Sequence, residues 1–445
     1  MIFNMFHHAL KIIEEVCIGC SRCMNSCPTD ALRIRNGKAK LISDRCIDCG
    51  KCYRVCPVNA IIVDHDDFKK IFNFKYRVAL IPAILTAQFD EEFEIEQIYS
   101  AIRELGFTHV YEVEHASVLL PDFISEYSKK TEERPLISSY CPAIVRMIQV
   151  KFPSLIDNIV RVTTPVDISS IYFRKLLEDS GAESKEVGLF YITPCAAKIA
   201  SVKSPVGEKR SNVDGVITLD FIYNRIFSIL HNKDMKLYPF KDHQEFNPEE
   251  ISWSLTGGEA KNIKTKRSLS IDGVSNVFRF LEQVESRELQ GVDYLELRAC
   301  DESCAGGILT VENRFIAADR LRKRSKSFHK GDGKKSDIFN HKSYLRKRSS
   351  VGKITPRSVD VLDEDFYQAM LKMQKLKEYE ETLPGVDCGV CGSPNCKALA
   401  RDIIDGKATL SYCVFLHHKM VEEESSTTKN MGKLLRSIWG NKKFE

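Results

Sequence analysis

The sequence predicts a multidomain protein with a small α+β module at the N-terminus, a larger α/β domain and a small C-terminal domain. Three observations lead to this prediction. A run of four cysteines is repeated before residue 60, strand and helix patterns alternate through the middle of the chain, and four more cysteines lie near its C-terminal end. A chain of 445 residues also has the length for two or three domains.

Composition argues against several classes of protein. The formal net charge is only +4, so the chain lacks the strong positive field that favours nucleic acid. Apolar residues make up 43 %, enough for an ordinary core, and no apolar run reaches membrane-spanning length. Met1–Leu10 lacks the pattern of a signal peptide, so none is expected. The sixteen cysteines sit in short metal-ligand spacings, which predicts metal binding in a reducing compartment, the cytoplasm.

The first domain, predicted over residues 1–75, contains two copies of the run C-x2-C-x2-C-x3-C-P, offset by 29 residues. This doubled run is typical of a ferredoxin-like α+β module with two [4Fe-4S] clusters, in which the fourth cysteine of each run ligates the other cluster. The predicted ligand sets are Cys17, Cys20, Cys23 and Cys56 for one cluster, and Cys46, Cys49, Cys52 and Cys27 for the other. Gly19 and Gly50 are expected to let loop amides turn toward cluster sulfurs. Structural zinc is the alternative, which the doubled run with both prolines disfavours.

The second domain, predicted over residues 76–320, has an α/β pattern. Val78–Leu85 and Val187–Ile192 are apolar runs typical of buried strands, and Ile95–Leu105 and Val274–Val284 have the periodicity of amphipathic helices. Ligands collect at the carboxyl ends of strands in such folds. Three motifs expected at such ends contain four cysteines, Cys141, Cys195, Cys300 and Cys304. Their number and position favour a further cluster over the alternative that each is a small buried apolar side chain.

These three motifs read SSYCP from Ser138, TPCAAK from Thr193 and ELRACDESCAGG from Glu296. In this order behind a two-cluster ferredoxin module, they resemble the [FeFe]-hydrogenase family, the iron-only hydrogenase large subunits. The resemblance covers most of residues 1–320 and includes Leu105–Tyr111 and Asn212–Thr218.

The resemblance implies an H-cluster in the central domain. The four cysteines would hold a [4Fe-4S] cubane, and Cys304 would also bridge to a two-iron subsite that carries carbon monoxide, cyanide and a bridging dithiolate. Lys198 matches the family's lysine that donates a hydrogen bond to a cyanide, a charge-assisted bond that is physically sensible. A solvated surface lysine is the alternative. Gly306 and Gly307 would let the backbone approach the metal closely.

The surroundings of this site depart from the family pattern. Tyr140 replaces the cysteine that passes protons to the two-iron unit in hydrogen-producing members, and a phenol with a pKa of about 10 is a poorer relay than a thiol at about 8.5. Thr193 and Arg298 replace the flanking methionines, and Asp301 replaces a proline. Upstream, the stretch 116–125 offers only Asp122 in place of the family's proton-path glutamates. These departures resemble the sensory branch of the family, in which turnover is slow.

The C-terminal part predicts a third domain. Residues 321–358 are basic and are expected to form an exposed linker, and the helix expected over Glu364–Glu381 carries an apolar stripe assigned to core packing. Within residues 359–420, four cysteines resemble the four-cysteine iron–sulfur domain of anaerobic electron-transfer proteins, which implies a fourth cubane at Cys388, Cys391, Cys396 and Cys413. Zinc is again the alternative. Residues 421–445 are expected to be a polar tail.

The four ligand sets use all sixteen cysteines. The resemblance implies an [FeFe]-hydrogenase-type oxidoreductase of low turnover, which reacts slowly and reversibly with H2, passes electrons through [4Fe-4S] clusters and serves as a hydrogen or redox sensor. Expected partners are H2 and protons, a redox partner such as ferredoxin or a separate signalling protein, and the proteins that mature the two-iron site. Neither a membrane nor nucleic acid is expected. The alternative is an electron-transfer or scaffold protein with the hydrogenase fold and no two-iron subsite.

Overall fold

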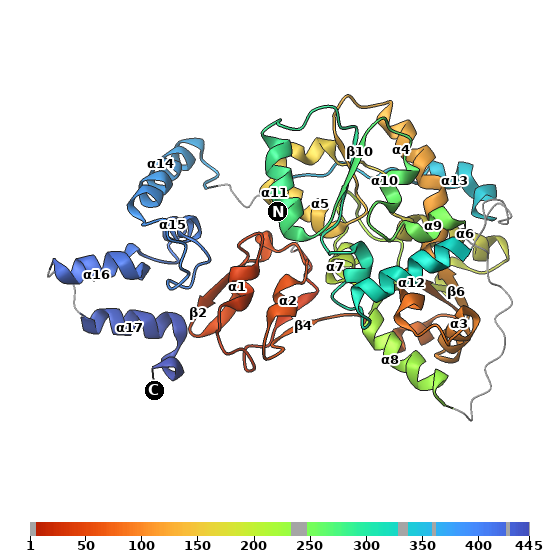
Figure 1. Ribbon diagram of the computed structural model, residues 1–445, viewed down its shortest axis with the longest axis horizontal. Coiled ribbons are helices and arrows are strands. Elements are labelled where there is room, and N and C mark those ends of the chain that lie inside the picture. The colour runs from red at the N-terminus through yellow and green to blue at the C-terminus, as the bar shows by residue number, and fades with distance from the viewer. Residues whose placement is uncertain (1–5, 233–246, 328–336, 358–361, 424–427, 445) are drawn as a thin grey trace. The chain divides into compact units, whose positions relative to one another are not determined.

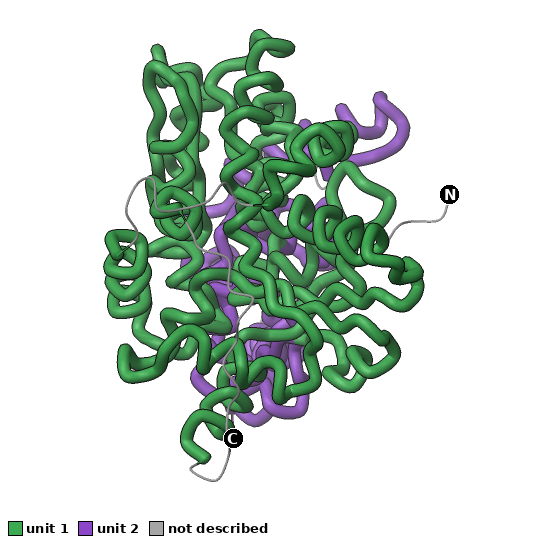
Figure 2. Tube along the Cα trace, turned by 90° about the vertical axis from the view of Figure 1, so that its right-hand side faces the viewer, with its two compact units in different colours: residues 1–9, 47–49, 64–356 green, residues 10–46, 50–63, 357–445 purple. Residues whose placement is uncertain are grey.

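The computed structural model describes residues 6–232, 247–327, 337–357, 362–423 and 428–444 (Figure 1). The chain divides into two compact units, coloured separately in Figure 2. Unit 1 consists of residues 1–9, 47–49 and 64–356, and unit 2 of residues 10–46, 50–63 and 357–445. Most of the N-terminal cysteine repeat therefore belongs to the same compact unit as the C-terminal cysteines.

The N-terminal part of unit 2 has the predicted α+β architecture. Strand β1 (Leu10–Ile12) pairs antiparallel with β4 (Ile61–Val63), and β2 (Leu32–Arg35) pairs antiparallel with β3 (Lys38–Leu41). Asn36 and Gly37 join β2 to β3 with φ angles of 53° and 69°, the left-handed pair that a two-residue hairpin requires. Short helices α1 (Arg22–Ser26) and α2 (Lys51–Val55) follow the first two cysteines of each run and contain the third.

In the described residues of its C-terminal part, unit 2 has the α-helices α14 (Phe366–Thr382), α15 (Cys396–Ile404), α16 (Val414–Glu422) and α17 (Thr428–Trp439). A small core joins Leu383, Leu399 and Ala400 to two of the cysteines. The expected packing stripe of α14 is largely wrong, because Phe366, Met370 and Met373 are exposed and only Leu376 packs against this core.

The expected polar tail is also wrong where the structure describes it. Ile438 of α17 is buried, and the Trp439 indole donates to the carbonyl of Val390 at 2.9 Å. The N–H groups of Asn36 and Gly37 donate to the carbonyls of Ser437 and Ile438 at 3.0 and 2.8 Å. The end of the chain is therefore an integral part of unit 2.

Unit 1 is built on two parallel sheets. The larger has the order β6 (His109–Glu112), β5 (Tyr76–Ile81), β8 (Val187–Thr193), β9 (Gly215–Thr218), and the smaller has the order β10 (Ser268–Ile271), β11 (Tyr294–Leu297), β7 (Leu136–Ile137). The central strands β5 and β8 consist mostly of buried apolar residues. Such continuous apolar runs are typical of parallel sheets, in which helices cover both faces. The α/β prediction is therefore confirmed.

Helices of unit 1 connect and flank these strands. They are α3 (Ile95–Glu104), α4 (Leu120–Ser128), α5 (Pro142–Lys151), α6 (Pro165–Asp179), α7 (Ala196–Lys203), α8 (Leu219–Leu230), α9 (Pro248–Ser252), α10 (Gly258–Asn262), α11 (Val274–Glu285), α12 (Arg314–Ser327) and α13 (Lys342–Arg346). Within the described ranges, no helix has both the length and the apolar character needed to cross a bilayer.

Part of the segment expected to be an exposed basic linker is instead packed. Leu321 in α12 and Leu345 in α13 are buried. The guanidinium of Arg324 contacts the buried carboxylate of Glu112 at 2.9 Å, with only 9 % of the arginine side chain exposed. Here the basic residues alternate with apolar ones that reach the core, which a count of charges does not reveal.

Candidate functional site

The two N-terminal cysteine loops repeat their backbone conformation as well as their sequence. Ser21 and Gly50, 29 residues apart, have φ angles of 63° and 76°. The amides of Ala31 and Ala60 lie 3.3 and 3.2 Å from the sulfurs of Cys27 and Cys56. Amide donors directed at thiolate sulfur match the environment expected of a cluster ligand.

The first predicted ligand set comes together in unit 2. Cys17, Cys20, Cys23 and Cys56 line one small cavity. Burial, and then the proximity of the other three sulfurs, raises the pKa of the Cys23 thiol to about 12. Four thiols packed this closely ionise together only if a cation compensates their charge, so the donor set fits a metal cluster.

The second predicted set is divided between the compact units. Cys27, Cys46 and Cys52 belong to unit 2, whereas Cys49 belongs to the short segment 47–49 of unit 1. This set stays a prediction from the repeat.

The C-terminal set also comes together in unit 2. Cys388, Cys391, Cys396 and Cys413 line one cavity with Gly389 and Leu399. The pKa of Cys391 is raised by burial and by the nearby sulfurs of Cys388 and Cys413, while Arg35 acts in the opposite direction. Gly389 and Gly392 both have a φ of 72°, so the loop adopts the left-handed turns that wrap closely around a bound group.

The central cysteines lie at the carboxyl ends of strands, as predicted. Cys141 follows β7 and forms the N-cap of α5, and Cys195 follows β8 and forms the N-cap of α7. Cys300 follows β11, and Cys304 lies in a short 3-10 helix, Ser303–Gly306. Thiolates at helix N-termini are favoured by the helix dipole. Burial raises the pKa of Cys195 to about 12, and the sulfurs of Cys304 and Cys141 add to this, whereas Lys198 opposes it.

The two glycines after Cys304 lie against the backbone of neighbouring segments, and their expected closeness to a metal stays a prediction. A side chain at Gly306 would collide with the carbonyl oxygen of Asp301, and one at Gly307 would collide with that of Pro194. The amide of Leu309 donates to the same Pro194 carbonyl at 3.0 Å. These glycines therefore let the third cysteine motif fold tightly and pack against the second.

Tyr140 and Lys198 lie beside Cys304. The Tyr140 hydroxyl is 3.5 Å from the sulfur of Cys304, and the Lys198 ammonium is 4.5 Å from the centre of the phenol ring. Lys198 also donates to the Tyr191 hydroxyl at 3.1 Å. Burial opposes the charge of Lys198, but the acidic groups of Tyr140, Tyr191 and Cys304 outweigh it and hold its pKa above the ordinary value. The surface-lysine alternative is wrong, since Lys198 is 7 % exposed.

A hydrogen-bonded chain leads away from Tyr140. Its hydroxyl lies 3.4 Å from that of Ser254, which in turn donates to the carboxylate of Glu114. Glu114 also accepts the amide of Ala83 at 2.8 Å. Burial, with repulsion from Glu112, raises the pKa of Glu114 despite these hydrogen bonds. A buried carboxyl of raised pKa at the end of such a chain has the properties of a proton donor or acceptor.

Sequence reasoning missed Glu114 and Ser254. The stretch 116–125 begins two residues after Glu114, and the one acid that it offers, Asp122, is half exposed and pairs with Lys342. Two acidic residues, Glu112 and Glu114, within the mostly apolar stretch Val110–Leu120 were the available signal, since a buried carboxylate needs a specific reason.

The residues that replace the family's methionines have structural partners. Arg298 is buried and paired with Glu259 at 2.8 Å and Glu296 at 3.2 Å, and its guanidinium lies 3.8 Å from the centre of the Tyr140 ring. The hydroxyl of Thr193 accepts the amide of Cys195 at 3.3 Å. Asp301 lies 3.5 Å from Arg314 at the surface.

The side chains of this site suit the [4Fe-4S] cubane better than they suit the two-iron unit. The central cysteines, all of them partly buried, supply four thiolates that suit a cubane. Lys198 and Cys304 supply the cation and the thiolate for a two-iron unit, but the phenol of Tyr140 takes up space next to both. A cavity of about 480 Å³ has Tyr140 and Lys198, but none of the four central cysteines, among its lining residues. The cation and the thiolate suit a two-iron unit chemically, and the phenol must move for the unit to fit between them.

Comparisons with known proteins agree with this architecture. Residues 75–244 match the family model of the iron-only hydrogenase large subunit, C-terminal domain. Residues 9–57 match the 4Fe-4S dicluster domain, and residues 383–415 match an iron–sulfur cluster family. These matches confirm the predicted hydrogenase-type domain and the iron–sulfur domains on either side of it.

Individual relatives are distant. Iron hydrogenase 1 from Clostridium pasteurianum is 25 % identical over 312 residues, which are 57 % of this chain and 51 % of that protein. The chain thus spans about half the length of this curated relative. Two variants of the [FeFe]-hydrogenase HydA1 from Chlamydomonas reinhardtii are similar in structure, each with 15 % identity, a TM-score of 0.48 and coverage of 63 % of this chain and 94 % of theirs.

Proposed function

We propose that this chain, an iron–sulfur protein with an iron-only hydrogenase-type domain, is a slow [FeFe]-hydrogenase that serves as a hydrogen or redox sensor. It would react reversibly with H2, release or take up protons, and exchange electrons through four [4Fe-4S] clusters held by its sixteen cysteines. The observation that carries the proposal is that the partly buried Cys304 lies beside the buried Tyr140 and Lys198, each side chain coming from a different cysteine motif.

The two-iron unit, when bound, would supply the metal site at which H2 is split or formed. Cys304 would hold it by its thiolate. Lys198 would hold its anionic ligands, because a buried ammonium that stays protonated donates strong charge-assisted hydrogen bonds. The buried side chains around the site would exclude water and strengthen these interactions.

Slow turnover follows from the proton path. If the phenol keeps its contact with Ser254 as it makes room for the two-iron unit, protons would move between this site and Glu114 through the hydroxyls of Tyr140 and Ser254. Burial, together with the charge of Cys304, raises the pKa of Tyr140 well above the ordinary value for a phenol. A hydroxyl that gives up its proton so reluctantly limits proton transfer near neutral pH.

The direct test is infrared spectroscopy of the full chain after anaerobic loading with iron, sulfide and a synthetic two-iron cofactor. Carbon monoxide and cyanide bands that shift under hydrogen would support the proposal. Filled cubanes with no such bands would refute it.

One observation favours a second function. Because the Tyr140 phenol contacts Lys198 and nearly reaches Cys304, it takes up space that the two-iron unit needs. If the phenol never turns away, the chain is an electron-transfer or scaffold protein with a hydrogenase fold. In that case the infrared bands are absent, although the cubanes still accept electrons.

The partners follow from the same reasoning. A hydrogenase of this type needs proteins that mature the two-iron site and a redox partner, such as ferredoxin or a separate signalling protein. Cysteines in metal-ligand spacings need a reducing compartment, which we take to be the cytoplasm.

A further inference from the structure

Within unit 2, strand β2 contacts the C-terminal cysteine loop through its backbone. The amide of Ile34 donates to the carbonyl of Gly392 at 2.9 Å. Ile34 lines the cavity of the first cysteine set, and Gly392 follows Cys391 in the C-terminal set. A side chain at Gly392 would collide with the Ile34 carbonyl, so this close approach requires glycine. One hydrogen bond therefore connects the surroundings of the two cysteine sets.

A second contact joins the same two sets. Met24 is buried and directly follows Cys23 in α1. A β-carbon placed on Gly389, which follows Cys388, would stand 3.3 Å from the terminal methyl of Met24 and 3.4 Å from the side-chain oxygen of Asn25. The two sets are thus separated, along this path, by one methionine side chain in van der Waals contact with a ligand loop.

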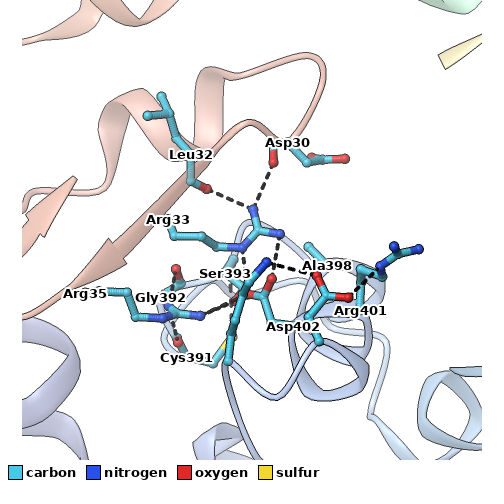
Figure 3. Close-up of polar contacts among 12 residues, drawn as sticks. Asp30, Leu32, Arg33, Arg35, Cys391, Gly392, Ser393, Ala398, Arg401 and Asp402 are labelled. Carbon is cyan, nitrogen blue, oxygen red and sulfur yellow. Dashed lines mark hydrogen bonds and ion pairs between the residues drawn. The ribbon is translucent and has the colours of Figure 1, made fainter. Parts of the chain in front are cut away.

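A buried ion-pair network holds these contacts in place (Figure 3). The carboxylate of Asp402 accepts hydrogen bonds from Arg33 at 2.6 and 3.1 Å, from Arg35 at 2.9 Å and from Ser393 at 2.7 Å. The Asp402 side chain is 2 % exposed. A buried carboxylate that accepts four hydrogen bonds from three side chains keeps a defined position, so β2 and the C-terminal loop are held rigidly together.

Arg35 reaches further, to the backbone of the cysteine loop itself. Its guanidinium donates to the carbonyls of Cys391 at 3.3 Å and Gly392 at 2.8 Å, and lies 5.7 Å from the ring of Tyr412, the neighbour of Cys413. A fixed positive charge in a poorly solvated position stabilises the more negative, reduced state of a nearby cluster.

We propose that the C-terminal cysteines and the set Cys17, Cys20, Cys23 and Cys56 hold two clusters that exchange electrons directly, and that Arg35 raises the reduction potential of the C-terminal one. In each transfer one electron leaves the reduced cluster, which is oxidised, and reduces the other, with no bond made or broken. A low-potential one-electron carrier protein supplies the electrons. The inference rests on the proposed function only in requiring clusters at these two sets, not in requiring a reaction with H2.

The test uses the full chain, reconstituted with iron and sulfide, reduced with dithionite and followed by electron paramagnetic resonance during redox titration. The reduced protein should show spin–spin splitting between two clusters. Cys413→Ser should remove one cluster signal and the part of the splitting that this cluster causes, while any splitting between the two N-terminal clusters remains. An unchanged line shape for the remaining signals would overturn the direct pairing.

Arg35 is tested in the same titration. Arg35→Gln should shift the midpoint potential of the signal lost in Cys413→Ser to a more negative value, whereas Arg35→Lys, which keeps the charge, should stay near the wild-type value. Lys407→Gln is a matched control, since Lys407 pairs with Asp405 at the surface of the same domain. Equal potentials for all variants at full iron content would overturn the role of Arg35. Infrared bands of a two-iron unit are scored separately, so failure of the hydrogenase proposal remains distinguishable.

Discussion

Replacing Tyr140 with cysteine tests why the proposed hydrogenase is slow. The substitution removes the phenol whose hydroxyl lies 3.5 Å from the sulfur of Cys304 and places a thiol on the same backbone position, closer to the chain. Ordinary pKa values of about 10 for a phenol and about 8.5 for a thiol differ by about 1.5 units, or about 2 kcal/mol. The ordinary difference serves as the estimate for this position. We therefore expect turnover to rise on the order of 30-fold.

The same substitution should destabilise the protein when no two-iron unit is bound. The phenol ring contacts the guanidinium of Arg298 at 3.8 Å and the ammonium of Lys198 at 4.5 Å. Losing a desolvated cation–π contact costs about 2 kcal/mol, and removing a large buried side chain leaves a void. We expect the free energy of unfolding to fall by about 2–4 kcal/mol. The two-iron unit should restore part of it by occupying the vacated space.

The assay is hydrogen-dependent viologen reduction, normalised to the intensity of the two-iron infrared bands. Tyr140→Phe is the control, because it keeps the ring and removes only the hydroxyl; it should be no faster than wild type. Normal infrared bands in Tyr140→Cys without a gain in turnover would refute proton transfer at Tyr140 as the limiting step.

Three further predictions follow from the described contacts. Glu114 is buried, and its pKa is raised above the ordinary 4.5. The free energy of unfolding of the wild type should therefore fall as pH rises from 4.5 through the raised pKa. Glu114→Gln lacks this titration, so urea titrations of the cluster-loaded protein should show it gaining stability relative to wild type over that interval. Lys198→Met should lose two-iron infrared bands but keep the cubane resonance signals, because only the anionic unit needs the ammonium; equal retention would contradict that role. Asp402→Ala should leave Arg33 and Arg35 without their buried partner and lower the free energy of unfolding by about 3–5 kcal/mol. The loss should appear as faster hydrogen exchange at the Ile34 amide. Unchanged exchange would show that β2 does not depend on this network.

The cysteine framework could be predicted because ligand spacing is a local property of the chain. Three thiolates reach one cluster only when they lie a few residues apart, so the spacing in the N-terminal repeat carries the information directly. Strand and helix periodicity likewise predicted β8 and α3 close to their observed limits, because burial on one or both faces imposes a pattern on neighbouring residues. Charge and polarity were poorer guides, since they assigned Arg324 to an exposed linker and Ile438 to a polar tail.

The sequence by itself thus determined the cysteine motifs, the domain types on which they lie and the unusual tyrosine beside Cys304. Only the tertiary structure decided which side chains from distant parts of the chain contact the residues around these motifs. Glu114 and Ser254 are 140 residues apart, and Arg33 and Asp402 are 369 residues apart, yet each pair is in direct contact. Such contacts depend on how separate elements pack, and the spacing of residues along one element carries no trace of them.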